Sequence, residues 1–217
     1  ATVSEVFRQT VTVFFATEIV GVENIGTVYI FYFTSGLLTI PLWTRIASRF
    51  DKHRSLAGAL VVVLVTNIAM YFIEHGQTTV FTIFFLIKGS CFGALMILPL
   101  AMVADTVDID TALTGERRQG LYFSVCTMLQ KLAYAVGQGL PLTLLGFIGF
   151  NAAGGNGADE LYWLQVCYSI VPACSVGFAI LALIPYTLTA KRHGELKDYL
   201  EKKEKDESTP LPNFLQN

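Results

Sequence analysis

Residues 80–103 read VFTIFFLIKGSCFGALMILPLAMV, a long apolar run whose one charged residue is Lys88. An α-helix rises about 1.5 Å per residue, so about 20 apolar residues cross the roughly 30 Å of hydrocarbon in a bilayer. The run is continuous, without the alternation of apolar and polar residues that is typical of a membrane β-barrel. The stretch therefore predicts a transmembrane helix.

Other stretches of the chain have the same length and apolar character. These stretches are residues 26–48, 55–73, 121–150 and 162–189. A weaker sixth helix is expected over residues 5–22. Because only helices and closed barrels satisfy the backbone in lipid, we expect an all-α, polytopic membrane protein. The predicted organisation is a six-helix bundle over residues 1–189 and a charged cytoplasmic tail over residues 190–217.

The charge distribution excludes several classes of protein. Charged residues make up 15% of the 217 residues, against about 25% in soluble domains. Of the 32 charges, 12 lie in residues 190–217, and only Glu74 and Lys88 fall between residues 55 and 103. A soluble enzyme, a disordered chain and a nucleic-acid binder are therefore poor interpretations. The lipid bilayer is the expected surrounding.

Basic residues gather in alternate loops. Residues 45–54 contain four Lys or Arg, residues 105–120 contain Arg117 and Arg118, and the tail contains six. The opposite loops, which join the remaining helix ends, contain none. Because Lys and Arg accumulate on the cytoplasmic side, the basic loops and both chain ends are expected in the cytoplasm. A bacterial inner membrane is the predicted location.

The sequence offers no pattern for a metal or a cofactor. The four cysteines fall inside predicted spans, and the three histidines lie in loops without ligand spacing. No nucleophile and base pair with enzymatic spacing is found either. We therefore expect no enzyme activity and no cofactor other than a coupling ion, Na⁺ or H⁺.

Lys131 is an ionisable residue deep inside a predicted span. Polar residues recur around it at steps of three and four, which places them on one helix face. These residues are Ser124, Thr127, Lys131, Tyr134 and Gln138. A charge in hydrocarbon costs at least about 2.5–3.5 kcal/mol, so the stripe is predicted to line a path for substrate and cation. The alternative is that Lys131 makes a structural contact with a carboxylate on another helix.

Three further charged residues lie in or near predicted spans. Glu5 and Arg8 are three residues apart, so they are neighbours on a helix and are expected to pair or to line the cavity. Lys88 lies only eight residues from the outer end of its span, so its long side chain is expected to extend to the interface.

Two loop signatures resemble one transporter family. The first is residues 41–54, PLWTRIASRFDKHR, and the second comprises ADTVD at 104–108, TGERRQG at 114–120 and QKL at 130–132. This combination is similar to the second half of the glycoside–pentoside–hexuronide:cation symporters of the major facilitator superfamily. One departure is Asp51, where that family usually has glycine.

The resemblance implies the C-terminal six-helix half of a symporter, with a truncated first helix and a missing N-terminal half as partner. It implies that Lys131 lies close to cation and sugar sites. It also places a group of charged residues in the cytoplasmic loops. We expect their charges to bridge the inner mouth as a gate; the alternative is that they only form solvated, positively charged loops. These residues are Arg45, Asp105, Asp108, Arg117 and Arg118.

The predicted function is symport of a sugar or related small solute with a cation by alternating access. A related branch carries lysolipids with Na⁺, so lysolipid:sodium symport remains an alternative. A membrane scaffold or accessory subunit that transports nothing is a second alternative. It would use the same helices with a polar stripe that is only packed.

Overall fold

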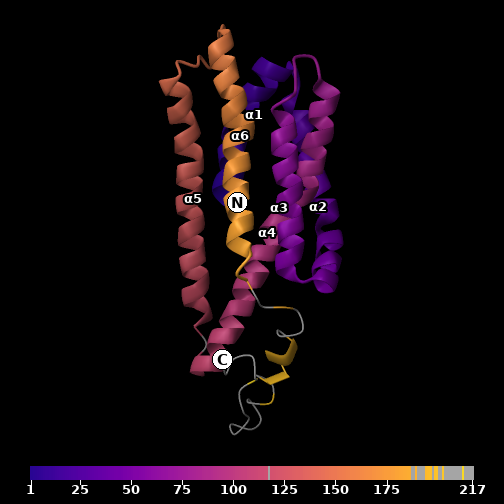
Figure 1. Ribbon diagram of the computed structural model, residues 1–217, viewed down its shortest axis with the longest axis vertical. Coiled ribbons are helices and arrows are strands. Elements are labelled where there is room, and N and C mark those ends of the chain that lie inside the picture. Colours follow the sequence, from indigo (N-terminus) through magenta and orange to yellow (C-terminus); the bar gives the residue numbers. More distant parts are fainter. Residues whose placement is uncertain are drawn as a thin grey trace.

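The computed structural model describes residues 1–116, 118–186, 189, 194–196, 198, 199, 202 and 212. Their long elements are all helical (Figure 1). The elements are α1 (Thr2–Phe14), the π-helix η1 (Phe15–Val20), α2 (Ile25–Phe50), α3 (Lys52–Met70), α4 (Thr78–Thr114), α5 (Gln119–Phe147) and α6 (Ala158–Leu183). The all-α, polytopic prediction is therefore confirmed.

Four helices, α2, α3, α4 and α6, are long and apolar enough to cross a membrane. The helix α5 has 29 residues but carries the polar stripe, so it falls outside this group. Five apolar spans were expected from the sequence, and the described residues give four. All six predicted helices form, with α1 continued by η1 up to Gly21, which ends it in the left-handed conformation.

Two helices run further toward the basic end than the sequence suggested. The helix α4 continues to Thr114, because no Gly or Pro follows Pro99 until Gly115, whose φ of +76° ends the helix. Asp105 and Asp108 therefore lie on α4 and not in a loop, which corrects the expectation above. Likewise α2 runs to Phe50, so its connection to α3 is a single residue.

That single residue is Asp51, at the position where the resembling family usually has glycine. Its φ and ψ are +71° and 149°, and no other non-glycine residue in the described part of the chain has a positive φ. Its carbonyl oxygen accepts hydrogen bonds from the backbone N–H and the hydroxyl of Ser55, at 3.1 and 2.8 Å. A conformation that favours glycine is thus held by an aspartate, with strain of about 1–3 kcal/mol.

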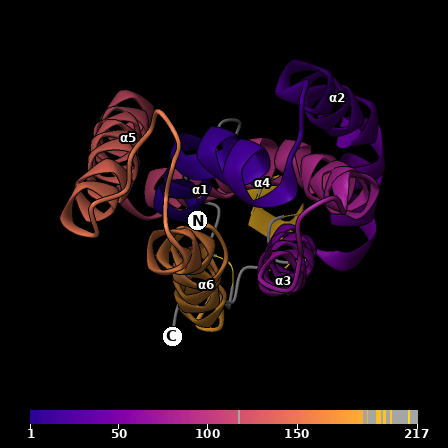
Figure 2. The same ribbon diagram turned by 90° about the horizontal axis from the view of Figure 1, so that it is seen from above.

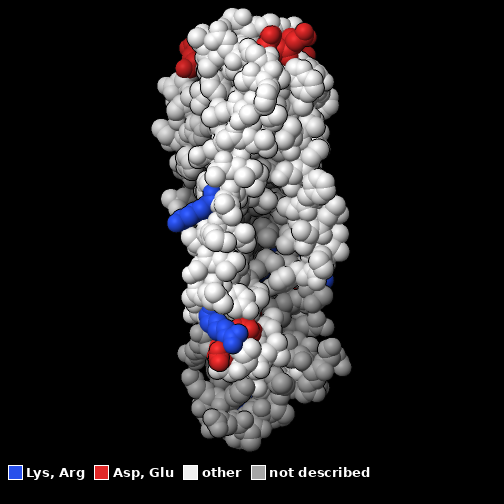
Figure 3. All heavy atoms as spheres, turned by 90° about the vertical axis from the view of Figure 1, so that its left-hand side faces the viewer, with Lys and Arg blue, Asp and Glu red and all other residues white. Residues whose placement is uncertain are grey.

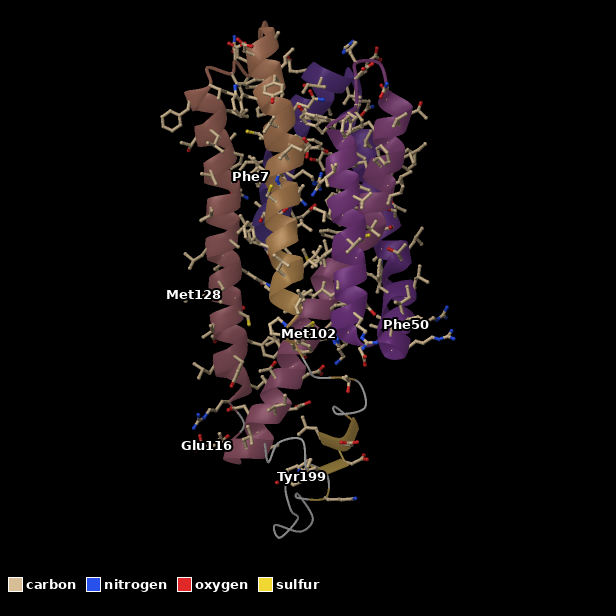
Figure 4. All side chains as sticks on the ribbon, in the orientation of Figure 1. Phe7, Phe50, Met102, Glu116, Met128 and Tyr199 are labelled. Carbon is tan, nitrogen blue, oxygen red and sulfur yellow. The ribbon has the colours of Figure 1, made fainter. Side chains whose placement is uncertain are left out.

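The helices form an upright bundle with α1 near its centre (Figure 2). The helix α1 packs against α5 and α6, α2 packs against α4, and α3 packs against α4 and α6. The helix α5 lies at the edge of the bundle, and α1 is its main neighbour. Large apolar side chains are exposed on the outside of the bundle: Met128 projects away from α5, whereas Phe7 lies inside the bundle (Figure 4).

Glycines bring α2 and α4 into backbone contact. A Cβ on Gly89 would lie 2.5 Å from the carbonyl oxygen of Tyr32, and one on Gly93 would lie 2.9 Å from that of Gly36. These contacts show that Gly89 and Gly93 serve the close packing of the two helices. On α5 the close approach is made by Gly137, whose Cβ would lie 2.8 Å from Val6. The crossing of α2 and α4 fixes the position of Tyr32 beside α1.

Candidate functional site

Glu5 and Arg8 of α1 lie at the centre of a polar cluster inside the bundle. The Oε1 atom of Glu5 accepts hydrogen bonds from Arg8 Nη2 at 2.5 Å, from Tyr32 OH at 2.7 Å and from Gln9 Nε2 at 3.0 Å. The predicted pairing of Glu5 with Arg8 is confirmed. Tyr32 comes from α2, so the cluster joins two helices that are far apart in the sequence.

Arg8 is almost completely buried, at 1% exposure. Its guanidinium carbon lies 5.7 Å from the ring centre of Tyr32 and 5.4 Å from that of Phe85, both within the range of a cation–π interaction. Its Nε atom and the hydroxyl of Tyr168 are buried and have no hydrogen-bond partner among the residues that the structure describes. The aromatic rings and Glu5 therefore replace the hydration that this guanidinium has lost.

The prediction that the Lys88 side chain extends to the membrane interface is wrong. This side chain is instead fully buried, at 0% exposure. The Nζ atom donates to Asn67 Oδ1 of α3 at 2.5 Å and lies 5.7 Å from the ring centre of Tyr168 on α6. A polar acceptor and an aromatic face inside the bundle hold the ammonium, so outward extension is unnecessary.

A cavity of about 150 Å³ lies on one side of this cluster. Glu5 and Gln9 of α1 form its polar wall, while Phe33, Phe92 and Tyr134 form an aromatic wall from α2, α4 and α5. Two residues predicted from separate patterns, Glu5 and Tyr134, thus line the same space. A carboxylate beside aromatic rings suits a small ligand that carries both hydroxyl groups and a hydrocarbon face.

The other residues of the α5 stripe lie apart from this cavity. Ser124, Thr127 and Lys131 line a shallow open hollow on α5. The two hydroxyl groups donate to backbone carbonyls of their own helix, both at 2.7 Å. Gln138 is exposed further along the helix. Figure 3 shows this side of the molecule, with a basic side chain midway along a surface of uncharged residues.

Lys131 itself is exposed. No ion pair of Lys131 is found among the residues that the structure describes. The polar stripe therefore forms one surface on one helix, and the structure brings only Tyr134 of this set next to Glu5.

At the basic end of the bundle, one charged pair joins two helices and another lies between neighbours in the sequence. Lys52 Nζ donates to both carboxylate oxygens of Asp105, at 2.6 and 2.8 Å, and ties the start of α3 to α4. Arg118 Nε donates to Glu116 at 2.9 Å, and this pair raises the pKa of Arg118. Arg45 is exposed at the end of α2. Asp105 thus bridges to a lysine that the predicted gate did not include.

The predicted gate has two further members, Asp108 and Arg117. Asp108 is partly buried on α4 and takes part in an interaction. Arg117 lies outside the described residues. Beyond α6, burial raises the pKa of Tyr186 to about 12, and the nearby negative charge of Asp105 acts in the same direction. The start of α3, α4 and the segment after α6 therefore meet around Asp105.

The opposite end of the bundle is tied together through η1. The carbonyl oxygen of Val20 accepts from the backbone N–H of Gly76 at 3.0 Å, and His75 Nδ1 lies 3.1 Å from the carbonyl oxygen of Ile19. Glu18 accepts from the side chain of Asn156 at 3.4 Å. The end of η1 thus contacts the loops before α4 and before α6.

Sequence reasoning missed Tyr32, Asn67, Tyr168 and Lys52 as partners of the charged groups. A lone lysine in an apolar run was the available signal for Lys88, because charges inside spans usually have a partner. No comparable signal in the sequence pointed to Asn67 or Tyr168. In the described part of the chain, no group of three or more His, Cys, Asp or Glu side chains is placed to hold a metal ion.

Apolar helices around a buried ionic cluster, with a polar and aromatic cavity beside it, define a polytopic membrane protein of the transporter class. Comparison with known families gives the particular group. The model of the family described as "MFS/sugar transport protein" matches residues 1–190, and the chain belongs to this family.

Individual relatives are more distant. The chain is 32% identical to a putative sulfoquinovose importer of Salmonella typhimurium over 66% of its length, which covers 31% of that protein. It is 21% identical to the putative glycoside/cation symporter YagG of Escherichia coli, and this match covers 88% of the chain and 42% of the relative. It is 26% identical to the sphingosine-1-phosphate transporter MFSD2B of Mus musculus, and this match covers 75% of the chain and 33% of the relative. The chain spans about a third of the length of the curated relatives that it matches.

Proposed function

We propose that this chain is part of a secondary transporter that carries a sugar or related small solute together with a cation. The observation that carries the proposal is the cavity of about 150 Å³ between Glu5, Gln9 and the aromatic wall. Its location beside a buried ionic cluster, within helices that span a bilayer, suits a solute site near the membrane midplane. Family membership and the symporter names among the relatives support the same class.

The chemistry of the cavity favours a polyol over a purely apolar ligand. The carboxylate of Glu5 is an acceptor for hydroxyl groups, and the Gln9 amide offers both a donor and an acceptor. Phe33, Phe92 and Tyr134 present surfaces against which the C–H face of a sugar ring packs. Relatives named for a sphingosine phosphate and for a lysophosphatidylcholine make lysolipids the class to compare with sugars.

In this proposal, the polar stripe of α5 extends the path from the cavity toward the basic end, which is cytoplasmic. A further six-helix half completes the site, and its movement against this bundle exposes the cavity to each side in turn. The coupling ion is Na⁺ or H⁺, and the membrane is the bacterial inner membrane. The cytoplasmic residues Arg45, Asp105, Asp108, Arg117 and Arg118 act as the gate, with Lys52 as the partner of Asp105.

Uptake by the full-length protein in proteoliposomes tests the proposal. The probes are radiolabelled methyl galactoside, methyl glucuronide and lysophosphatidylcholine, each with an imposed Na⁺ or pH gradient. We expect concentrative uptake of a glycoside, and its loss in Lys131→Ala with the protein still folded. Unchanged concentrative uptake in that variant would remove Lys131 from the mechanism, and uptake of the lysolipid alone would overturn the sugar assignment.

A further inference from the structure

The carboxylate of Glu5 uses its two oxygen atoms differently. The Oε1 atom accepts all three hydrogen bonds, from Arg8, Tyr32 and Gln9. The Oε2 atom accepts none from the residues that the structure describes, and it is accessible rather than enclosed. The Glu5 side chain keeps 13% exposure and lines the cavity of about 150 Å³. One oxygen therefore anchors the side chain to the protein, while the other is open to a ligand.

The anchoring donors keep Glu5 ionised. A guanidinium stays protonated in proteins, and that of Arg8 donates directly to the Oε1 atom. The Tyr32 hydroxyl and the Gln9 amide add two more hydrogen bonds to the same oxygen, and such bonds favour the charged form. An ionised carboxylate is only an acceptor. The open oxygen can therefore bind a hydroxyl group, but not the oxygen of another ionised acid.

The rest of the cavity wall offers no positive side chain. Among the described residues that line it, none is Lys, Arg or His. Arg8 is 1% exposed and is absent from the lining. Apart from Glu5 and the neutral polar residues Thr2, Gln9 and Tyr134, the lining is apolar. A carboxylate, sulfonate or phosphate on a solute would lose its hydration here and meet a like charge, without a basic side chain to replace the water.

A cationic solute is not favoured either. The negative charge of Glu5 is already neutralised by Arg8 at 2.5 Å, and the described lining holds no second carboxylate. An entering cation would give up its hydration without a net negative charge in return. A neutral solute with several hydroxyl groups avoids both costs. One hydroxyl donates to Oε2, and the C–H face of the ring packs against Phe33 and Phe92.

We propose that Glu5 Oε2 is a hydroxyl-binding atom of the solute site, and that this site selects neutral polyhydroxy solutes over acidic sugars, sugar sulfonates and phosphate-bearing lipids. The inference rests on the proposed transport function and narrows its substrate class. Selection by charge follows from the arrangement of the pair, since the carboxylate of Glu5 faces the cavity and the guanidinium of Arg8 does not.

The test measures counterflow of radiolabelled methyl galactoside by the full-length protein in proteoliposomes, which needs no ion gradient. Two competitors differ from this probe only at C6, where methyl galacturonide has a carboxylate and methyl galacturonamide has a neutral amide. Half-inhibition should need at least about 100-fold more of the acid than of methyl galactoside, because like charges about 4 Å apart repel strongly even at an effective dielectric constant of about 20. The amide should inhibit nearly as well as methyl galactoside. Methyl glucoside and methyl glucuronide form a second pair of the same kind.

Two variants test the role of Glu5. In Glu5→Gln the three donors retain the side-chain oxygen, so a neutral NH₂ group replaces the open Oε2 atom. In Gln9→Lys an ammonium enters the cavity wall while Glu5 and Arg8 stay paired. Each change should lower the discrimination against the acid by at least about tenfold. The matched control is Thr79→Lys, which adds the same charge at an exposed residue at the start of α4 and should leave the discrimination unchanged.

The outcomes separate the selection by charge from transport itself. Half-inhibition by the acids at the same concentrations as by the neutral glycosides in the wild type would overturn the selection, whether or not any variant folds. Full discrimination in both Glu5→Gln and Gln9→Lys would overturn the assignment of Glu5. Counterflow of labelled acids alone would overturn the selection but leave sugar transport intact. Absence of counterflow for every labelled glycoside, neutral or acidic, would instead overturn the proposed transport function.

Discussion

The crossing of α2 and α4 should tolerate no side chain at Gly89. In Gly89→Ala the new Cβ would lie 2.5 Å from the carbonyl oxygen of Tyr32, 2.5 Å from Ser35 Oγ and 3.0 Å from the Cα of Tyr32. The hydroxyl of Ser35 can rotate away, but a backbone carbonyl cannot. The two helices must therefore separate by about 1 Å to restore ordinary van der Waals distances.

The separation also weakens hydrogen bonds that run from α2 to α4. Ser35 Oγ donates to the carbonyl oxygen of Leu86 at 3.2 Å. Thr39 Oγ1 and Trp43 Nε1 both donate to the carbonyl oxygen of Ser90 at 2.7 Å. Overpacking costs about 1–3 kcal/mol, and a hydrogen bond between membrane helices contributes about 0.6 kcal/mol. We expect the free energy of unfolding to fall by about 3 kcal/mol.

Thermal unfolding of the purified full-length protein in detergent measures this effect. For a domain of about 200 residues, 1 kcal/mol corresponds to about 2–4 °C, and the shift is smaller in a longer protein, so Gly89→Ala should lower the Tm of the full-length protein by up to about 6–12 °C. The control is Gly58→Ala on α3, where a Cβ meets no atom of the described residues within 4 Å. That change should raise stability by about 0.5–1 kcal/mol through helix propensity. Equal Tm values for the two variants would refute the proposed backbone contact.

Two further predictions concern the basic end of the bundle. Asp51→Gly should raise Tm by about 2–4 °C, because relief of about 1–3 kcal/mol of strain exceeds the loss of the long, 3.8 Å pair with the exposed Arg54; a lower Tm would show that the aspartate side chain stabilises the turn more than its backbone strains it. Asp105→Asn should lower the free energy of unfolding by about 2 kcal/mol, because two charge-assisted hydrogen bonds from Lys52 are weakened. Exchange of the two charges, with Lys52→Asp and Asp105→Lys together, should recover part of the loss, and no recovery would argue against a direct pair.

Local sequence was sufficient for the fold because lipid leaves few choices. An unbroken apolar run of about 20 residues must form a helix, since no water is present to satisfy its backbone. The residues at which the helices end were harder to predict. The helix α4 continues through ADTVDIDTALT to Gly115, because polar residues with adequate helix propensity extend a helix beyond the apolar region. Hydropathy therefore marks where a helix lies in the membrane, not where it ends.

The partners of the buried charges depend on how distant segments pack. Lys88 lies on α4, while Asn67 is 21 residues before it and Tyr168 is on the last helix. Judged only from its position in the span, the Lys88 side chain was expected to extend to the interface, because this costs less free energy than burial. The glycine contacts between α2 and α4 and the packing of α3 on α4 and α6 create the enclosed site instead. Pairing of Glu5 with Arg8 was predictable because it depends only on helical spacing.

The location of Lys131 constrains what covers α5. The helix has α1 as its main neighbour, and its stripe of hydroxyl, amide and ammonium groups is exposed in the described structure. If this face met hydrocarbon, Lys131 alone would cost at least about 2.5–3.5 kcal/mol. The outer face of α2 has large apolar residues, such as Leu37 and Leu38 at 69% and 71% exposure, and meets lipid without such a cost. In a membrane, the α5 stripe must therefore face water or another polar protein surface, and the cavity beside Glu5 and Tyr134 opens toward the same helix.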